Sequence, residues 1–229
     1  NKKIAYSILE LAIVSSGVTL EQTFKNSVDL AQKTEEMGYK RFWLAEHHNM
    51  IHVASVATSV LIGHIAGNTK SIRVGSGGIM LPNHSPLIVA EQFGTLGRLY
   101  PNRIDLGLGR APGTDQITAH AIRSDRMQSV HNFPGEIKQI QKYFSSGNEW
   151  SQVRAVVAEG VNVPLYILGS SLDSAHLAAK MGLPYAFASH FATGLLQEAL
   201  DIYRKEFQPS EYLAKPYTIA GVNVIAADT

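Results

Sequence analysis

Short apolar runs alternate along this chain with longer segments of helical apolar spacing, and this alternation constrains the fold more than any other feature. The runs predict strands and the segments between them predict helices. Strand–helix repeats of this kind form parallel sheets with right-handed crossovers. The expected strands are residues 4–11, 41–45, 72–81, 103–108, 163–168, 185–188 and 217–226, and the expected helices are 20–37, 54–66, 86–99, 133–144, 174–181 and 195–207, with an irregular polar stretch over 111–132.

Two architectures satisfy this pattern, a (β/α)8 barrel and an open, doubly wound sheet of seven strands. A barrel takes about 250 residues, whereas this sequence has 229 and stops where a seventh unit should turn into its helix. We predict an α/β fold of the (β/α)8 TIM-barrel type that lacks its last C-terminal unit, with the open sheet as the alternative. Because no linker or repeat divides the sequence, we expect a single domain over residues 1–229.

Composition excludes several classes of function. The chain has 20 Lys and Arg against 19 Asp and Glu, which gives no electrostatic reason to expect a nucleic-acid or membrane partner. It has no cysteine, which excludes disulfide scaffolds, thiolate zinc sites and a cysteine nucleophile. The sequence shows neither a signal-peptide pattern nor an apolar run of about 18 residues. We therefore expect a cytoplasmic protein.

Polar residues and glycines recur directly after or near the ends of the expected strands. The carboxyl ends of parallel barrel strands share one face, where active sites lie. We therefore expect these residues to gather around one site. They are Glu46, His47 and His48; Ser76, Gly77 and Gly78; Gly109 and Arg110; Gly169, Ser170 and Ser171; and Ser189 and His190.

The Glu46-His47-His48 sequence admits a metal site or an acid–base site. Adjacent residues at a strand end point to opposite sides, so the two histidines should not share one ion, and no His-x-x-x-His pattern supplies other ligands. We predict no metal. One histidine is expected to act in proton transfer, and the other is expected to be structural.

Two glycine pairs indicate a close approach to the backbone. Gly107 and Gly109 would let a flat ligand lie near the chain, with Arg110 offering a planar cation to an anionic group. The alternative is that these glycines fit a tapering barrel, and the spacing is not a nicotinamide fingerprint. Gly77 and Gly78 predict a bulge or a close backbone approach, or a kink that closes the barrel wall.

Residues 168–174 are expected to form a strand, a tight turn and a helix start. Free backbone N–H groups and small hydroxyls at such a turn suit a phosphate. The alternative is ordinary helix capping by Asp173 or a neighbouring serine. The segment is not a nucleophile elbow, because it does not read G-x-S-x-G.

Together these segments resemble the bacterial luciferase-like flavin monooxygenases, and within them the small bacterial luciferase-family oxidoreductases. The likeness runs in order through the whole chain and is specific as a set. Its segments are 43–49 (WLAEHHN), 74–86 (VGSGGIMLPNHSP), 90–95 (AEQFGT), 103–115 (RIDLGLGRAPGTD), 168–175 (LGSSLDSA) and 182–191 (GLPYAFASHF).

The resemblance implies a luciferase-like barrel that binds FMN, supplied in reduced form by a separate NAD(P)H flavin reductase, and uses O2 to oxygenate a small organic substrate. It implies that His47 is catalytic and that Gly77–Gly78 is a non-prolyl cis peptide beneath the flavin ring. Relatives commonly form dimers, for which the helices expected over 54–66 and 86–99 are candidates. The cofactor-binding residues are Glu46, Gly77, Gly78, Gly109, Arg110, Arg123, Gly169, Ser170, Ser171, Ser189 and His190, with the phosphate expected near Arg110, Arg123, Ser170 and Ser171.

One departure from the family pattern limits the inference. Bacterial luciferase has a reactive cysteine beside the flavin where this chain has Gly109, so light emission is not implied. Two alternatives to the monooxygenase remain. One is an oxidoreductase that uses the deazaflavin F420, and the other is a non-catalytic flavin-binding protein similar to the nonfluorescent flavoprotein of luminous bacteria.

Overall fold

The computed structural model describes residues 4–225 and divides into two compact units, Asn1–Pro164 and Leu165–Thr229. The expectation of a single domain over residues 1–229 stays a prediction.

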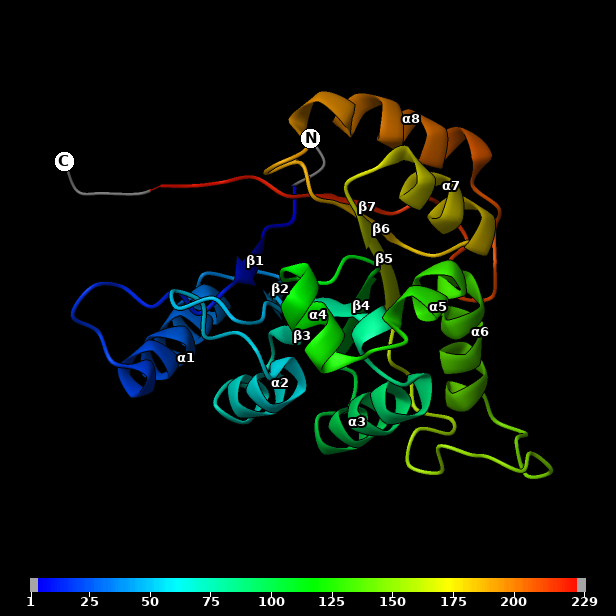
Figure 1. Ribbon diagram of the computed structural model, residues 1–229, viewed down its shortest axis with the longest axis horizontal. Coiled ribbons are helices and arrows are strands. Elements are labelled where there is room, and N and C mark those ends of the chain that lie inside the picture. Colours follow the sequence, from blue (N-terminus) through cyan, green and yellow to red (C-terminus); the bar gives the residue numbers. More distant parts are fainter. Residues whose placement is uncertain (1–3, 226–229) are drawn as a thin grey trace. The chain divides into compact units, whose positions relative to one another are not determined.

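The first unit contains four parallel strands that pair in sequence order. Helices follow the first three strands, as the alternation predicted (Figure 1). The strands are β1 (Ser7–Glu10), β2 (Arg41–Leu44), β3 (Arg73–Met80) and β4 (Ile104–Gly109), and the helices are α1 (Leu20–Glu36), α2 (Thr58–Gly67) and α3 (Pro86–Leu99). Apolar residues of β2, β3 and β4 are buried and form much of the core of this unit.

The expectation of an irregular stretch over residues 111–132 was wrong. Two short helices, α4 (Gln116–Ile122) and α5 (Arg126–His131), lie in it and precede α6 (Phe133–Phe144). Asp115 is the N-cap of α4, and its carboxylate accepts hydrogen bonds from the N–H and hydroxyl of Thr118 at 3.0 and 2.7 Å. The polar composition concealed these helices because their exposed faces outweigh the few buried positions.

The start of α2 also differs from the expected residue 54. The backbone before Thr58 bonds to the loop after β1 instead of continuing the helix: Ala54 N–H donates to Ala12 O at 2.9 Å, and Ser55 N–H donates to Leu11 O at 3.2 Å. The backbone groups of an apolar run can form hydrogen bonds within a helix or with another segment. Here the contact with the loop after β1 keeps residues 54–57 out of the helix. Between β3 and α3, residues Leu81–Asn83 form a short 3-10 turn.

The second unit contains three parallel strands, again paired in sequence order. They are β5 (Leu165–Gly169), β6 (Tyr185–Phe187) and β7 (Thr218–Ala220), with helices α7 (Leu172–Met181) and α8 (Leu196–Glu206) and a 3-10 turn at Thr193–Leu195. Helix α7 ends at Gly182 with φ +60°, the left-handed cap that glycine favours. Strand β7 is shorter than the expected 217–226, because its pairing to β6 ends at Ala220; Ala226 lies outside the described residues.

Candidate functional site

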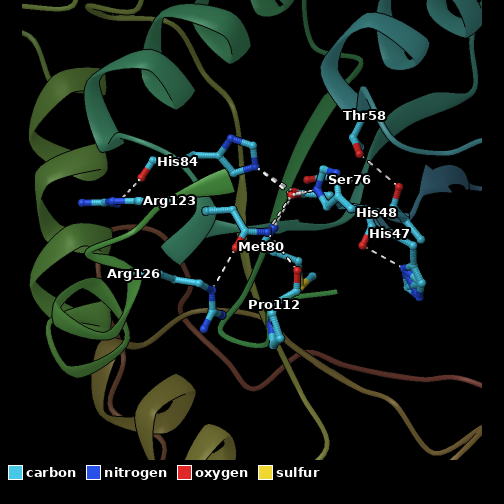
Figure 2. A network of polar contacts seen from close by, with 12 residues as sticks. His47, His48, Thr58, Ser76, Met80, His84, Pro112, Arg123 and Arg126 are labelled. Carbon is cyan, nitrogen blue, oxygen red and sulfur yellow. Dashed lines mark hydrogen bonds and ion pairs between the residues drawn. The ribbon is translucent and has the colours of Figure 1, made fainter. Parts of the chain in front are cut away.

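The carboxylate of Glu46 is the centre of a polar network at the carboxyl end of β2. Its partners His48, Met80 and His84 are labelled in Figure 2. Glu46 is 1% exposed. His48 Nε2 donates to it at 2.7 Å and His84 Nε2 lies 2.9 Å from both oxygens. The N–H of Met80 donates at 2.8 Å and the amide of Asn83 at 3.1 Å. One carboxylate therefore joins the segments that follow β2 and β3.

Burial by itself would raise the pKa of Glu46, but the groups around it act the other way. Hydrogen bonds from His48 and His84, the charge of His84 and the backbone N–H of Met80 lower this pKa to about 2. The carboxyl group of Glu46 is thus ionised at neutral pH, and both of its oxygens are already hydrogen-bonded to protein groups. Direct contact between Glu46 and a cofactor stays a prediction; the structure shows a carboxylate that holds loops together.

His47 makes contacts different from those of its neighbour His48. Its Nδ1 lies 2.8 Å from the carbonyl oxygen of Glu46. Because a carbonyl oxygen can only accept, Nδ1 carries the proton and Nε2 keeps its lone pair in the neutral ring. Burial and the charge of His48 lower the pKa of His47, against the opposing effect of Glu46. The ring is therefore neutral at pH 7, with Nε2 available as a proton acceptor.

The expected absence of a metal at the histidines near Glu46 stays a prediction. Nε2 of both His48 and His84 is occupied by the Glu46 carboxylate. Within residues 4–225, no group of three or more His, Cys, Asp or Glu side chains could hold a metal ion.

Strand β3 is irregular where the two adjacent glycines occur. Its register against β4 shifts between Ser76 and Ile79, an irregularity of the kind that these glycines predicted, and the Gly77–Gly78 peptide bond is cis, as the resemblance implied. The Ser76 hydroxyl donates to Gly107 O at 2.8 Å and accepts the N–H of Gly107 at 3.0 Å. This side chain thus joins the two strands across the irregularity.

Two of the predicted glycines, Gly77 and Gly109, are closely packed by side chains. A Cβ at Gly77 would lie 2.7 Å from Leu9 Cδ1 and 3.2 Å from Trp43. A Cβ at Gly109 would lie 2.6 Å from Met80 Cε. The Trp43 contact restricts Gly77, whereas the end of the flexible Met80 side chain could move away from a Cβ at Gly109. Contact between their backbones and a flat ligand stays a prediction.

A buried arginine that the sequence reasoning missed fixes the loop after β4. Arg126 Nε donates to Asn83 Oδ1 at 2.9 Å, and Nη2 donates to Arg110 O at 2.8 Å. The amide of Asn83 donates to Pro112 O at 2.9 Å. The burial of Arg126 is known only from the structure, and no local sequence pattern singled this residue out.

The two predicted phosphate-binding arginines of the first unit lie near this network. Arg123 Nη1 donates to His84 O at 2.7 Å, and Nε pairs with Asp125 at 2.8 Å. Arg110 is exposed and its carbonyl accepts from Arg126. Recognition of a phosphate by Arg110 or Arg123 stays a prediction.

In the second unit, the turn after β5 leaves the start of α7 without a side-chain cap. Ser171 is the N-cap residue, but its side chain makes no capping hydrogen bond. The hydroxyl of Ser174 turns back to Ser171 O at 2.6 Å and lies 2.9 Å from the Tyr185 hydroxyl. The Ser171 side chain therefore does not cap α7, and the choice between ordinary capping and a phosphate site stays a prediction. Uncapped N–H groups suit an anionic group, and Gly169, Ser170 and Ser171 are half-buried beside them.

Of the two predicted residues after β6, the Ser189 side chain has a hydrogen-bond partner and the His190 Nδ1 atom has none among the described residues. The Ser189 hydroxyl donates to Gly221 O at 2.6 Å. His190 Nδ1 is buried and has no hydrogen-bond partner in the described part of the chain. Burial lowers the pKa of His190, and its ring meets Phe191 edge-on at 4.6 Å. A buried polar atom without a partner is uncommon and fits contact with a group that the chain itself does not supply.

A model of the luciferase-like monooxygenase family matches residues 6–229. The chain is 58% identical to protein YvbT of Bacillus subtilis (strain 168) and 53% identical to a luciferase-like monooxygenase of Escherichia coli (strain K12). Each match covers all 229 residues and 68% of the relative. The crystal structure of apo-MsnO8 superposes with a TM-score of 0.90 at 38% identity, covering 95% of this chain and 65% of that one. The chain thus spans about two thirds of these relatives.

Two more distant structures share the fold alone. One is the oxygenating constituent of 3,6-diketocamphane monooxygenase from Pseudomonas putida in complex with FMN (TM-score 0.72, 16% identity, covering 90% of this chain and 64% of that one). The other is an F420-dependent secondary alcohol dehydrogenase (TM-score 0.70, 16% identity, covering 89% and 64%). In the described part of the chain, no helix is long and apolar enough to cross a membrane.

These matches confirm the predicted fold class, an α/β fold of the luciferase-like barrel type. They also indicate an oxidoreductase. The chain therefore belongs to the luciferase-like monooxygenase family.

Proposed function

We propose that the protein binds reduced FMN and uses O2 to oxygenate a small organic substrate without emitting light. The observation that carries the proposal is the state of His47. Its Nδ1 proton is held by the Glu46 carbonyl, and its pKa is lowered, so a neutral Nε2 can accept a proton at pH 7. A reaction that moves protons between a cofactor, oxygen and a substrate requires such a group.

The residues of each unit fit a flavin phosphate ester. In the second unit, the uncapped N-terminus of α7 suits the phosphate, and the unpaired His190 Nδ1 suits a polar group of the ligand. In the first unit, His47 lies on the segment after β2, and the Gly77–Gly78 backbone packs on Trp43. When bound, reduced flavin supplies the electrons that activate O2.

The chain's own residues bind, orient and handle protons in this proposal. His47 Nε2 accepts a proton or holds it near the reacting atoms. The network around Glu46 fixes the loops that carry His47 and Arg110, because its hydrogen bonds run from Glu46 through Asn83 to Arg126. Rigid support of this kind keeps a reacting group in place.

Partners follow from the same proposal. A protein that receives its flavin in reduced form needs a separate NAD(P)H flavin reductase, and we include a homodimer among the expected assemblies. Helix α2 is apolar on most of its faces, yet Val60 on it is 69% exposed. A second copy of the chain is the partner that we expect to cover it.

The test is an anaerobic titration of the purified protein with reduced FMN and, in parallel, with reduced F420, followed by admission of O2. We expect saturable binding of FMN and a transient absorbance that belongs to neither reduced nor oxidised flavin. His47→Ala should bind FMN but change the decay of that transient. The control is His131→Ala, because the exposed His131 also donates Nδ1 to a carbonyl, that of Met127, at 2.7 Å.

Each other outcome selects a different function. Binding of F420 without FMN would replace the monooxygenase with a deazaflavin oxidoreductase. Binding of oxidised FMN with no oxygen-dependent transient would indicate a flavin-binding protein without this activity. If His131→Ala changes the transient as much as His47→Ala, the proposed role of His47 is wrong.

A further inference from the structure

Two hydrogen bonds bracket the main chain of Glu46, and both end on Ser55. The Ser55 hydroxyl donates to the carbonyl oxygen of Ala45 at 2.5 Å. The N–H of His47 donates to the carbonyl oxygen of Ser55 at 3.0 Å. Between these two points lies the Glu46 carbonyl, which accepts the Nδ1 proton of His47 at 2.8 Å. Ser55 therefore holds the backbone on both sides of the group that orients the imidazole.

Ser55 is itself firmly placed. It is 0% exposed, and its N–H donates to Leu11 O at 3.2 Å. The preceding residue, Ala54, donates to Ala12 O at 2.9 Å. The segment that contacts His47 is thus anchored to the loop after β1, and a change in the Ser55 side chain alters one defined link in an otherwise fixed surrounding.

The chain supplies a matched comparison in Thr58. Its hydroxyl donates to the same Ala45 oxygen at 3.0 Å (Figure 2), and Thr58 is also buried. The His47 N–H, however, bonds to the carbonyl of Ser55 and not to that of Thr58. Loss of either hydroxyl removes one hydrogen bond and leaves Ala45 O with the other, so the two losses should cost similar stability.

We infer that Ser55 is a positioning residue that sets the tautomer and orientation of His47. Its hydroxyl and carbonyl fix the Glu46 peptide, which in turn keeps the proton on Nδ1 and leaves Nε2 free to accept. Only the step from a positioned His47 to turnover rests on the proposed function. The effect on the imidazole itself belongs to the protein without any ligand.

The experiment is a pH titration by NMR of protein labelled with 15N-histidine, comparing wild type, Ser55→Ala and Thr58→Val. We expect the Nδ1–H tautomer for His47 in wild type and Thr58→Val. Ser55→Ala keeps the carbonyl that accepts the His47 N–H but releases that residue from its hydroxyl anchor on Ala45 O, whereas Thr58→Val leaves the anchor in place. In Ser55→Ala we therefore expect a detectable Nε2–H fraction and a His47 pKa that rises toward its ordinary value, because the ring becomes less confined and better hydrated. With reduced FMN and O2, Ser55→Ala should slow the His47-dependent step about tenfold, whereas Thr58→Val should not.

The inference is overturned if Ser55→Ala keeps the wild-type tautomer and pKa of His47, or if Thr58→Val changes them equally. If Ser55→Ala does not fold, Ser55→Cys takes its place under the same criteria, because a thiol is a weaker donor of similar shape. Failure of FMN to bind wild-type protein would contradict the proposed function, while the tautomer measurements would still decide the role of Ser55.

Discussion

Two of the buried carboxylates of the first unit, Asp105 and Glu46, have opposite kinds of partner. Asp105, 0% exposed within β4, contacts Arg41 Nε at 3.1 Å and Arg73 Nη2 at 2.5 Å. Glu46, 1% exposed after β2, is held by two histidines and by uncharged amide groups. Arginine stays charged at any pH that a folded protein survives, whereas histidine changes charge near neutrality.

The comparison indicates that one buried carboxylate stabilises the strands, whereas the other positions the loops of the candidate site. The Asp105 cluster joins β2, β3 and β4 within the strands through permanent charges, and it also receives the indole N–H of Trp43 at 3.1 Å. The Glu46 cluster joins the loops beyond those strands through groups that can gain or lose protons. We expect the first cluster to matter most for folding and the second to respond to pH.

Asp105→Asn should have the largest effect on stability. The substitution leaves two arginines, one of them buried, facing a neutral group, and breaking such a buried pair costs about 3–5 kcal/mol. Urea denaturation at pH 7 measures the loss. The control is Asp125→Asn, because Asp125 pairs with Arg123 on the surface and should show no measurable change. Equal stability of the two variants would contradict a structural role for Asp105.

Glu46→Gln should change how stability depends on pH. The pKa of Glu46 is about 2 in the folded protein, below its ordinary value of 4.5. A lowered carboxyl pKa stabilises the fold above the ordinary value, and this stability is lost as pH falls from about 4.5 to about 2. The linked free energy is about 3 kcal/mol. Unfolding curves from pH 6 to 2 should show that Glu46→Gln loses less stability than wild type.

A second carboxyl provides a control of opposite sign. Burial raises the pKa of Glu136, whose carboxylate accepts from the Ser129 hydroxyl at 2.5 Å. A carboxyl group whose pKa is raised in the folded state stabilises the fold when it is protonated, so Glu136 adds stability as pH falls. Glu136→Gln should lack this contribution. If Glu46→Gln and Glu136→Gln shift the pH dependence in the same direction, the assignment for Glu46 is wrong.

Arg126→Lys should have the smallest effect of the three. A lysine keeps the charge but presents its donors from one point, so either Asn83 Oδ1 or Arg110 O loses its partner. An unpaired buried acceptor costs about 1–3 kcal/mol. Reduced FMN should also bind less tightly if the Arg110 loop moves, and the titration described above measures this. Unchanged stability together with unchanged binding would show that Arg126 does not support that loop.

The elements with a strong internal signal were predicted well. Residues 86–99 and 133–144 form helices with the expected bounds, because each combines helical apolar spacing with proline in its first turn. The short helices α4 and α5 were missed and the start of α2 was misplaced. In those segments, capping by Asp115 and pairing with the loop after β1 decide the backbone.

The sequence offered candidate site residues but not the contacts that connect them. The sequence singled out Glu46, His47 and the Gly77–Gly78 pair from their places at strand ends. It did not indicate Asn83 or Arg126, which contact the Glu46 network from segments 37 and 80 positions further along the chain. Contacts between residues so far apart leave no local pattern.

By itself, the sequence determined the alternation of strands and helices, the parallel sheet class and the clustering of polar residues after strands, because these follow from local periodicity and chain geometry. Only the tertiary structure decided which histidine is held by a carboxylate and which keeps a free lone pair. His47 and His48 are identical, adjacent residues. Their difference arises because Glu46 offers its carboxylate to one and its carbonyl oxygen to the other, and that choice depends on groups brought together from distant parts of the chain.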